Sequence, residues 1–186
     1  LCFDVVVRSN SAPTGWSNDF FKNLIFKFFF RFAKTIIVNS FEFKKQLDKK
    51  FGTKSKVIYN PLNLEEIKRK SKEKIKFKIF NRKSSIKFIN IARFTDQKDH
   101  LTLLEAFKRL EKKINYELLI MGYGVNYHKI KNFININNLS KNIKIIKFQK
   151  NPYKFLKKSN VLVLSSIFEG LPNVLLEALA LKKFVI

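Results

Sequence analysis

The feature that most constrains the fold is an alternation of short apolar runs with amphipathic segments, which begins at residue 86 and continues to residue 186. Strands are predicted at residues 86–92, 116–121, 143–148, 161–165 and 184–186, and helices at residues 101–110, 128–137, 152–158 and 172–181. Short apolar strands that alternate with helices are typical of a parallel sheet covered on both faces, which is an open α/β fold. Because ligands of that fold bind beyond the carboxyl ends of the strands, functional residues are expected there.

The first 60 residues repeat the pattern. Strands are predicted at residues 3–7, 35–38 and 56–59, and helices in a Phe-rich segment from Phe20 and at residues 41–50. Asn60-Pro61 is a turn signal, and the residues that follow are rich in Lys. We therefore predict the end of one α/β domain at 1–60, a charged linker or exposed helix at 61–85, and an incomplete second domain at 86–186. Since the chain lacks an initiator Met and ends in an apolar run, we expect truncation at both ends.

The charge balance is strongly basic, with 38 Lys and Arg against 14 Asp and Glu and a net charge of +24. Such a charge attracts nucleic acid, anionic lipid headgroups or phosphorylated small molecules, although a chain rich in Lys, Asn and Ile also fits a compositional bias of its genome. A hydrophobic fraction of 46% with 21 Phe is enough for packed cores. With one Cys and two His, an internal disulfide is excluded, a zinc site is not expected, and a reducing cytoplasmic setting is the expectation.

The Phe-rich segment at residues 20–33 is too short and too charged to span a bilayer. At helical spacing, Asn23, Lys27, Arg31 and Lys34 fall on one side, and Phe covers most of the rest. Such a helix can lie in a membrane interface. The favoured interpretation is a helix packed on a sheet, with its basic stripe in water.

Two features follow predicted strands of the second half. Arg93 and Lys98 lie in one loop just before a helix, where two cations and a helix N-terminus can hold a phosphate or diphosphate. A solvated basic loop is the competing interpretation. Gly122 and Gly124 allow a ligand to approach the backbone closely, but an isolated G-x-G is equally a plain turn.

The third feature is the sequence FEGLPNVLLEALA at residues 168–180. Pro172 suits a first helical position, and the helix that follows is apolar on nearly every face, as buried helices are. Glu177 then needs a partner, since a buried carboxylate without one costs several kcal/mol. Glu169, in the loop before the helix, can reach sugar hydroxyls or cap locally, and Glu177 can serve a ligand or pair with a core cation.

Taken together, these blocks resemble the retaining glycosyltransferases of the GT-B fold, family 4 (group 1). The resemblance rests on Ala92-Arg93-Phe94, Gln97-Lys98-Asp99-His100, Leu104-Glu105-Ala106-Phe107, Met121-Gly122-Tyr123-Gly124, Phe148-Gln149-Lys150-Asn151-Pro152-Tyr153, Val163-Leu164-Ser165-Ser166, Glu169-Gly170-Leu171-Pro172-Asn173 and Leu176-Glu177-Ala178. The two glutamates of the last blocks match the family's E-x7-E signature. A looser likeness extends back through residues 58–61 and 38–40. The resemblance implies two Rossmann-like domains with parallel sheets, here truncated.

The resemblance also implies roles for the residues. Arg93 and Lys98 would hold the donor diphosphate and offset the charge that grows on it, so no metal or other cofactor is expected. Glu169 would contact hydroxyls of the transferred sugar, and Glu177 would accept hydrogen bonds from the ribose. The loop around the sugar comprises Gly170, Leu171, Pro172 and Asn173; Phe148, Gln149, Lys150 and Asn151 would lie near the base, with Gly122 and Gly124 also at the donor.

Retention in this family is described as a front-face substitution, so no protein nucleophile is assigned and the two glutamates are not a hydrolase pair. The expected donor is a nucleotide sugar, UDP-linked, and the expected acceptor a saccharide or lipid-linked saccharide in cell-surface polysaccharide or glycan synthesis. We expect a cytoplasmic protein, peripheral on the inner face of an anionic membrane. Arg8, Ser9 and Asn10 follow a predicted strand and are expected at the cleft, without a defined role.

Three alternatives stay open. The chain can be an inactive or donor-binding-only fragment. A nucleic-acid-binding protein fits the charge, but the chain shows no recognition motif and no nucleic-acid partner is expected. A dinucleotide-dependent dehydrogenase fits the alternation, but no strand here is followed by G-x-G-x-x-G.

Overall fold

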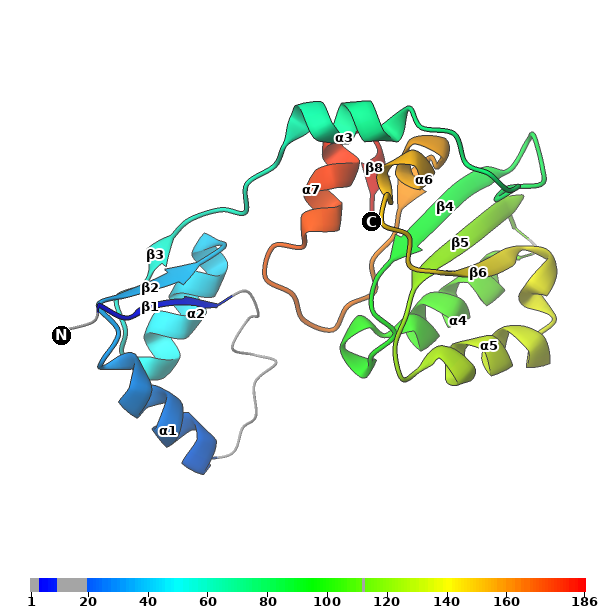
Figure 1. Cartoon of the computed structure of the whole chain (residues 1–186). Coiled ribbons are helices and arrows are strands. Elements are labelled where there is room, and N and C mark those ends of the chain that lie inside the picture. The colour runs from blue at the N-terminus through cyan, green and yellow to red at the C-terminus, as the bar shows by residue number, and fades with distance from the viewer. Residues whose placement is uncertain (1–3, 10–19, 112) are drawn as a thin grey trace. The chain divides into compact units, whose positions relative to one another are not determined.

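The computed structural model describes residues 4–9, 20–111 and 113–186, which divide into two compact units. The first unit comprises Leu1–Pro61 with Phe168–Asn173, and the second comprises Leu62–Ile167 with Val174–Ile186. Each unit contains a sheet whose strand pairs are all parallel (Figure 1). The expected α/β class is therefore confirmed.

The first unit has a three-stranded sheet in the order β1-β2-β3. Its elements are β1 (Val6–Ser9), α1 (Phe20–Phe30), β2 (Thr35–Val38), α2 (Phe41–Phe51) and β3 (Lys56–Val57). Helix α2 begins after Ser40, whose side chain accepts a hydrogen bond from the Phe43 amide at 3.1 Å, and it ends at Gly52 in the left-handed conformation. The predicted residues Phe3 and Asn10 lie outside the described residues, and β3 is shorter than predicted because its pairing with β2 ends at Val57.

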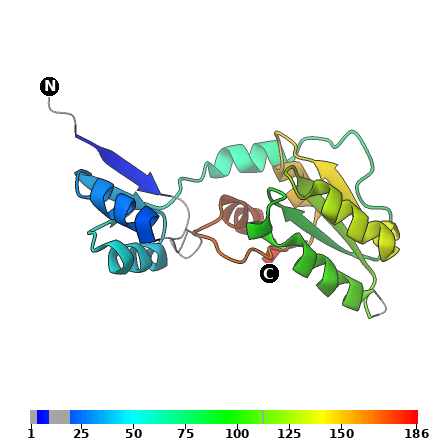
Figure 2. The same ribbon diagram turned by 90° about the horizontal axis from the view of Figure 1, so that it is seen from below.

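The second unit has a five-stranded sheet in the order β6-β5-β4-β7-β8. Its strands are β4 (Ile86–Ile91), β5 (Tyr116–Gly122), β6 (Ile143–Lys147), β7 (Val161–Leu162) and β8 (Phe184–Val185). Its α-helices are α3 (Leu64–Ser71), α4 (His100–Leu110), α5 (Tyr127–Ile136), α6 (Tyr153–Lys158) and α7 (Asn173–Ala180), the last beginning at the unit boundary. Figures 1 and 2 show α4 and α5 on one face of this sheet and α3, α6 and α7 on the other.

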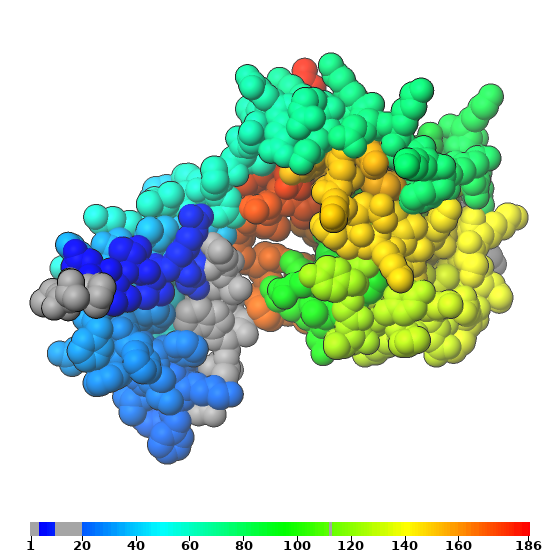
Figure 3. Space-filling model, in the orientation of Figure 1, coloured from blue at the N-terminus to red at the C-terminus, as the bar shows by residue number. Residues whose placement is uncertain are grey.

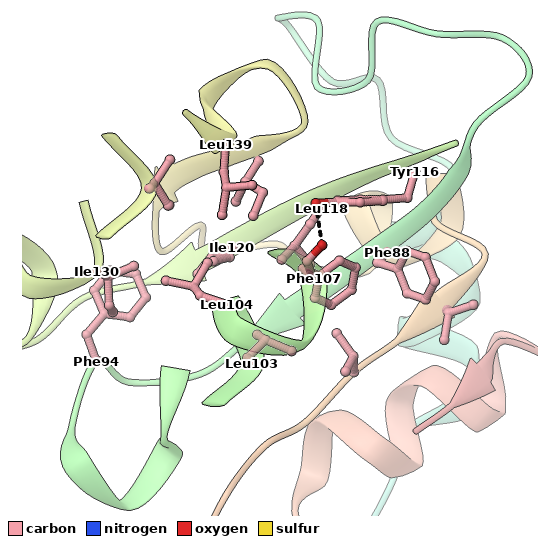
Figure 4. Packing of buried hydrophobic residues seen from close by; sticks show 14 residues of the cluster. Phe88, Phe94, Leu103, Leu104, Phe107, Tyr116, Leu118, Ile120, Ile130 and Leu139 are labelled. Atoms are coloured by element: carbon pink, nitrogen blue, oxygen red, sulfur yellow. Dashed lines mark hydrogen bonds between the residues drawn. The ribbon is translucent and has the colours of Figure 1, made fainter. Parts of the chain in front are cut away.

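The two faces of this sheet follow from the alternation of side chains along each strand. In β4 and β5, Phe88, Leu118 and Ile120 point to the α4–α5 side and join one core cluster (Figure 4). The intervening residues Ile89 and Leu119 join a second cluster with α3, α6 and α7. Because both faces are buried, β4 and β5 are mostly apolar, with Lys87 and Asn90 in β4 and Glu117 in β5 as the exceptions, which is why the sequence pattern identified them.

Strand β7 is shorter than the predicted residues 161–165. The pairing of β7 with β4 ends at Leu162, but the extended chain keeps two further backbone bonds. The Val163 amide donates to the Ile89 carbonyl at 2.9 Å, and the Leu164 amide to the Ile186 carbonyl at 2.8 Å. The predicted segment is therefore extended to Leu164 even though the paired ladder is short.

Residues 62–85 belong to the second unit. Helix α3 packs on α6 with Ile67 buried, and its Asn63 cap accepts a hydrogen bond from the Glu66 amide at 2.9 Å. The loop after α3 is fastened to β5 by the buried carboxylate of Glu117, which accepts hydrogen bonds from the Asn81 and Arg82 amides and the Ser85 hydroxyl. Burial by itself would raise the pKa of Glu117, but these donors outweigh it, so the pKa lies below its usual value.

Candidate functional site

The topology of the second sheet creates a switch point between β4 and β7. From β4 the chain proceeds outward through β5 to β6, then returns to the other side of β4 with β7 and β8. In open parallel sheets the crevice for a ligand lies at the carboxyl ends of the strands where the order reverses. The loops after β4 and β7 flank this point, and the loop after β5 adjoins it. These are the loops in which the sequence placed Arg93, Lys98 and Gly122.

The loop after β4 is fixed to the loop after β7 by two hydrogen bonds. The Ser165 hydroxyl donates to the Lys98 carbonyl at 2.9 Å, and the Ile167 amide donates to the Gln97 carbonyl at 2.9 Å. At the end of the β4 loop, Asp99 caps α4 by accepting from the Thr102 amide at 3.2 Å. Its backbone is left-handed, with φ of 38°. The backbone that carries Lys98 is therefore held by the loop after β7, and the residue that follows it, Asp99, is held by the start of α4.

The loop after β4 is also joined to the loop after β5. The Phe94 amide donates to the Tyr123 carbonyl at 2.7 Å, and the Asn126 amide donates to the Phe94 carbonyl at 3.0 Å. The Asn126 side chain adds a bond to the Asp96 carboxylate at 2.8 Å. Three loops from adjacent strands thus form one connected edge.

Gly122 and Gly124 have a structural function that the sequence left open. A Cβ atom added to Gly122 would lie 1.9 Å from the Ala92 carbonyl oxygen, and one added to Gly124 would lie 2.5 Å from the Phe94 carbonyl oxygen. Gly124 also has φ of 148°, which side chains rarely adopt. The close approach predicted for a ligand is made here by the chain's own backbone, while contact with a donor stays a prediction.

Charged side chains of both signs lie along this edge. Arg93 is exposed directly after β4, and Lys98 is partly buried at the end of the short turn at Asp96–Lys98. Asp96 and Asp99 are bound to Asn126 and to the start of α4, respectively. The carboxylates of Asp96 and Asp99 thus accept hydrogen bonds from the protein itself. Arg93 and Lys98 belong to the same short segment.

The segment after β6 contributes residues of two kinds. Phe148 is bonded to the β5 loop through its amide and the Gly122 carbonyl at 3.1 Å, and its exposed ring meets the exposed ring of Tyr123 edge to face at 6.3 Å. Asn151 instead joins two helices: it accepts from the Tyr153 amide at 3.1 Å and donates to the Lys70 carbonyl at 2.9 Å. Gln149 donates to the Lys147 carbonyl at 3.1 Å. Tyr123 is an exposed aromatic residue at the carboxyl edge of the sheet that the sequence analysis did not single out. Its position between two glycines was the available signal.

Helix α7 differs from the fully buried helix that its composition indicated. It begins at Asn173 rather than Pro172, and of its residues only Ala178 is buried in this structure. Glu177 is half-buried and has a partner within the second unit, because the Tyr153 hydroxyl lies 3.4 Å from its carboxylate. Burial raises the pKa of Glu177, and the bond from Tyr153 only partly offsets that rise. The acid therefore sits at a partly covered position.

The loop that contains Glu169 is grouped with the first unit, where Asn60 organises it. The Asn60 amide donates to the Asn173 side-chain oxygen at 2.6 Å and to the Leu171 carbonyl at 3.3 Å. Arg8, which lies within β1 rather than after it, donates to the Asn60 side-chain oxygen at 2.9 Å. The role of Arg8 that the sequence left undefined is thus partly structural.

Two negative findings hold for the described residues alone. Within residues 4–9, 20–111 and 113–186, no three His, Cys, Asp or Glu side chains gather as a metal site would require. In the same part of the chain, every helix is too short or too polar to cross a membrane.

Comparisons with known proteins agree on one family. The family model described as glycosyl transferases group 1 matches residues 71–186. The chain is 40% identical over 168 residues to the uncharacterized glycosyltransferase MJ1059 of Methanocaldococcus jannaschii, covering 88% of this chain and 41% of that protein. It is 35% identical over 128 residues to an N-acetylgalactosaminyltransferase of Campylobacter jejuni that acts on a diphospho-undecaprenol saccharide, covering 68% of this chain and 33% of that protein.

Solved structures agree on the fold. Anabaena Alr3699/HepE, in complex with UDP and glucose, matches 98% of this chain and 52% of its own, with a TM-score of 0.79 and 16% identity. Staphylococcus aureus TarM, in a complex that contains UDP, matches 98% and 36%, with a TM-score of 0.76 and 18% identity. The fold is that of part of a GT-B protein, and the chain spans between a third and about two-fifths of the length of the first curated relatives.

Proposed function

The chain belongs to the glycosyl transferases group 1 family, and from this membership we propose that it carries the donor site of a retaining glycosyltransferase. The enzyme moves a sugar from a nucleotide sugar, UDP-linked, to a saccharide or lipid-linked saccharide in the synthesis of a cell-surface polysaccharide or glycan. UDP is favoured as the nucleotide because the names of several structural neighbours include it. A lipid-linked acceptor is favoured because the Campylobacter relative is named for one.

The observation that carries the proposal is the connected edge at the switch point. The bonds from Ser165 to the Lys98 carbonyl and from Phe94 to Tyr123 hold the loops after β4, β5 and β7 together. A preorganised set of donors and cations is what a leaving diphosphate requires, since it stabilises charge without rearranging during the reaction. We assign Arg93 and Lys98 to that diphosphate, and no metal is part of the proposal.

The remaining roles follow the family pattern. Glu169 contacts hydroxyls of the transferred sugar, with Gly170, Leu171 and Pro172 shaping the loop around it. Glu177 accepts hydrogen bonds from the ribose, and Phe148 with Tyr123 offers an aromatic pair for the base. Substitution occurs on the front face, with the departing diphosphate taking the acceptor proton, so no side chain is assigned as a nucleophile.

The setting we propose is the cytoplasmic face of an anionic membrane, where a lipid-linked acceptor is available. The net charge of +24 favours such a surface. A second candidate function, donor binding without transfer, is favoured by one observation: this chain spans between a third and about two-fifths of its first curated relatives. Titration with UDP, NAD and single-stranded DNA separates donor binding from the dehydrogenase and nucleic-acid alternatives.

Sugar transfer by the complete protein that contains this chain tests the proposal. Arg93→Ala should lower kcat by a factor on the order of 100 to 1,000, the loss typical for one group that stabilises transition-state charge. Glu169→Ala should lower kcat/KM by a factor on the order of 10 to 100, because hydrogen bonds from the sugar hydroxyls to a charged group are lost. Arg109→Ala, at an exposed cation in the last turn of α4, is the matched control and should act like the parent protein. Near-normal rates in both site variants would refute the assigned roles.

A further inference from the structure

Helix α1 exposes an apolar surface that the described residues of the first unit leave uncovered. None of its eleven described residues is buried. Its packing side is formed by Phe26 and Phe30, whose rings lie 6.3 and 5.3 Å from the ring of Phe51 in α2. Six large apolar side chains elsewhere on the helix are more than half exposed: Phe20, Phe21, Leu24, Ile25, Phe28 and Phe29. In Figure 3, the mid-blue side chains of this helix lie at the surface. The favoured sequence interpretation, a helix packed on a sheet with its basic stripe in water, holds only for the side of α1 that carries Phe30, which packs against the cluster containing Ile36 and Val38. The other Phe side chains of α1 stay exposed.

The outward face has a defined position on the helix. At about 100° per residue, Leu24 and Phe28 lie opposite the side that Phe26 and Phe30 turn toward Phe51. Lys27 lies between the two sides, and Arg31, one residue past the end of α1, falls beside Leu24 at the same spacing; both cations are exposed. An apolar face with long cations along its edge is the arrangement of interfacial helices, in which aliphatic stems pass along the apolar region and the charges reach anionic headgroups.

The charge around the exposed face of α1 indicates which kind of partner can bind there. Residues 20–34 contain Lys and Arg but no Asp or Glu. A second copy would bring like charges together along the same helix, which opposes self-association. An anionic bilayer instead offers both an apolar layer and phosphates at one boundary. Because juxtamembrane cations add attraction to that surface, charge and apolar area act together there.

We propose that α1 docks the protein on an anionic phospholipid bilayer, with the Leu24–Phe28 face in the boundary between headgroups and acyl chains and with Lys27 and Arg31 on lipid phosphates. The docking proposal extends the proposed function and rests on it for its biological meaning. It names α1 as the element that brings the donor site to a membrane. Binding itself requires no donor and no transfer, so the two proposals can fail separately.

Flotation with vesicles tests the docking. The chain should bind vesicles of phosphatidylcholine mixed with phosphatidylglycerol, bind weakly to phosphatidylcholine alone, and lose affinity as salt is raised. Leu24→Ser/Phe28→Ser and Lys27→Glu/Arg31→Glu should each weaken binding about tenfold or more. The controls, Val125→Ser/Ile136→Ser and Lys129→Glu/Lys131→Glu, change exposed apolar and basic residues of the second unit and should bind nearly as the parent chain does. Equal losses in the α1 variants and the controls would overturn the proposal, as would binding that no α1 variant reduces.

A fluorophore provides a measurement that does not depend on how the α1 variants fold. In a Cys2→Ser background, an environment-sensitive dye on Phe29→Cys should shift to the blue with anionic vesicles only, and a dye on Ile136→Cys should not shift. A blue-shifted signal without lipid, in this chain or in the complete protein, would mean that another protein surface covers α1 and would refute docking. Transfer to a water-soluble acceptor should persist in the α1 variants; its absence in the parent protein with docking intact would reject the proposed function alone.

Discussion

The Tyr153 hydroxyl lies 3.4 Å from the carboxylate of Glu177 and links α6 to α7 in the second unit. The two residues affect each other electrostatically. Burial and the nearby carboxylate raise the pKa of Tyr153, and burial raises the pKa of Glu177. Glu177 is therefore an acid that binds its proton more tightly than an exposed glutamate does.

The first prediction concerns the pH dependence of UDP binding. A raised pKa means that Glu177 becomes protonated at a pH above its usual 4.5 as the solution is acidified, and a neutral acid accepts ribose hydrogen bonds less well. UDP affinity, measured by calorimetry from neutral pH downward, should fall through this region. Glu177→Gln should remove the step and weaken binding at neutral pH about tenfold. Glu105→Gln, at an exposed acid of α4, is the control and should retain the step; a step that persists in Glu177→Gln would contradict the assignment.

The second prediction concerns the partner of that acid. Because the bond from Tyr153 lowers the pKa of Glu177, Tyr153→Phe should raise that pKa further while the packing of the ring is kept. Carbon-13 NMR titration of the Glu177 carboxyl provides the measurement, and the midpoint of the UDP step should move in the same direction. A midpoint that stays fixed or moves to lower pH would show that the hydroxyl contributes nothing to the carboxylate.

The third prediction concerns the glycine after β5. Gly122→Ala should destabilise the chain by about 2–3 kcal/mol or more in urea unfolding, because the new methyl group would overlap the Ala92 carbonyl. Gly52→Ala is the control: nothing lies within 4 Å of its added Cβ, and its φ of 68° carries only the cost of a left-handed alanine, about 1 kcal/mol. Equal losses in the two variants would contradict the steric explanation.

The fourth prediction concerns acid stability. His100 is buried with no hydrogen-bond partner for either ring nitrogen among the described residues, its ring edge-on to Phe94 at 5.1 Å. Burial, with help from the Lys98 charge, lowers the pKa of His100 from 6.5 to about 4. In the unfolded chain His100 keeps its usual pKa of 6.5, so the unfolded state binds a proton more readily than the folded state does. The stability that neutral His100 contributes is therefore complete above pH 6.5 and is lost as the pH falls toward 4. The full loss is roughly 3 kcal/mol.

Urea unfolding between neutral pH and pH 4 measures that loss. His100→Phe should retain more of its neutral-pH stability on acidification than the parent chain, since it removes the titrating group while keeping an aromatic ring beside Phe94. His128→Phe, at an exposed position of α5, should leave the acid dependence unchanged. Identical acid profiles for His100→Phe and the parent chain would reject burial of this imidazole as the cause.

The sequence by itself determined the class of the fold, most of its elements and the loops that carry the candidate site residues. Apolar runs such as residues 86–91 and amphipathic segments such as residues 101–110 are local patterns, and local pattern decides which segments become strands or helices. The motifs at Arg93, Gly122 and Glu169 likewise identified the family from spacing along the chain.

Only the tertiary structure decided what those residues contact. It showed that the Gly122 backbone is approached by Ala92, that Asn151 joins two helices, that Tyr153 is the partner of Glu177, and that α1 leaves most of its Phe side chains uncovered. Each of these depends on neighbours distant in the sequence, brought close by the order and register of the strands. Hydrophobic periodicity specifies which face of an element is apolar, but it does not specify which surface, if any, will cover that face.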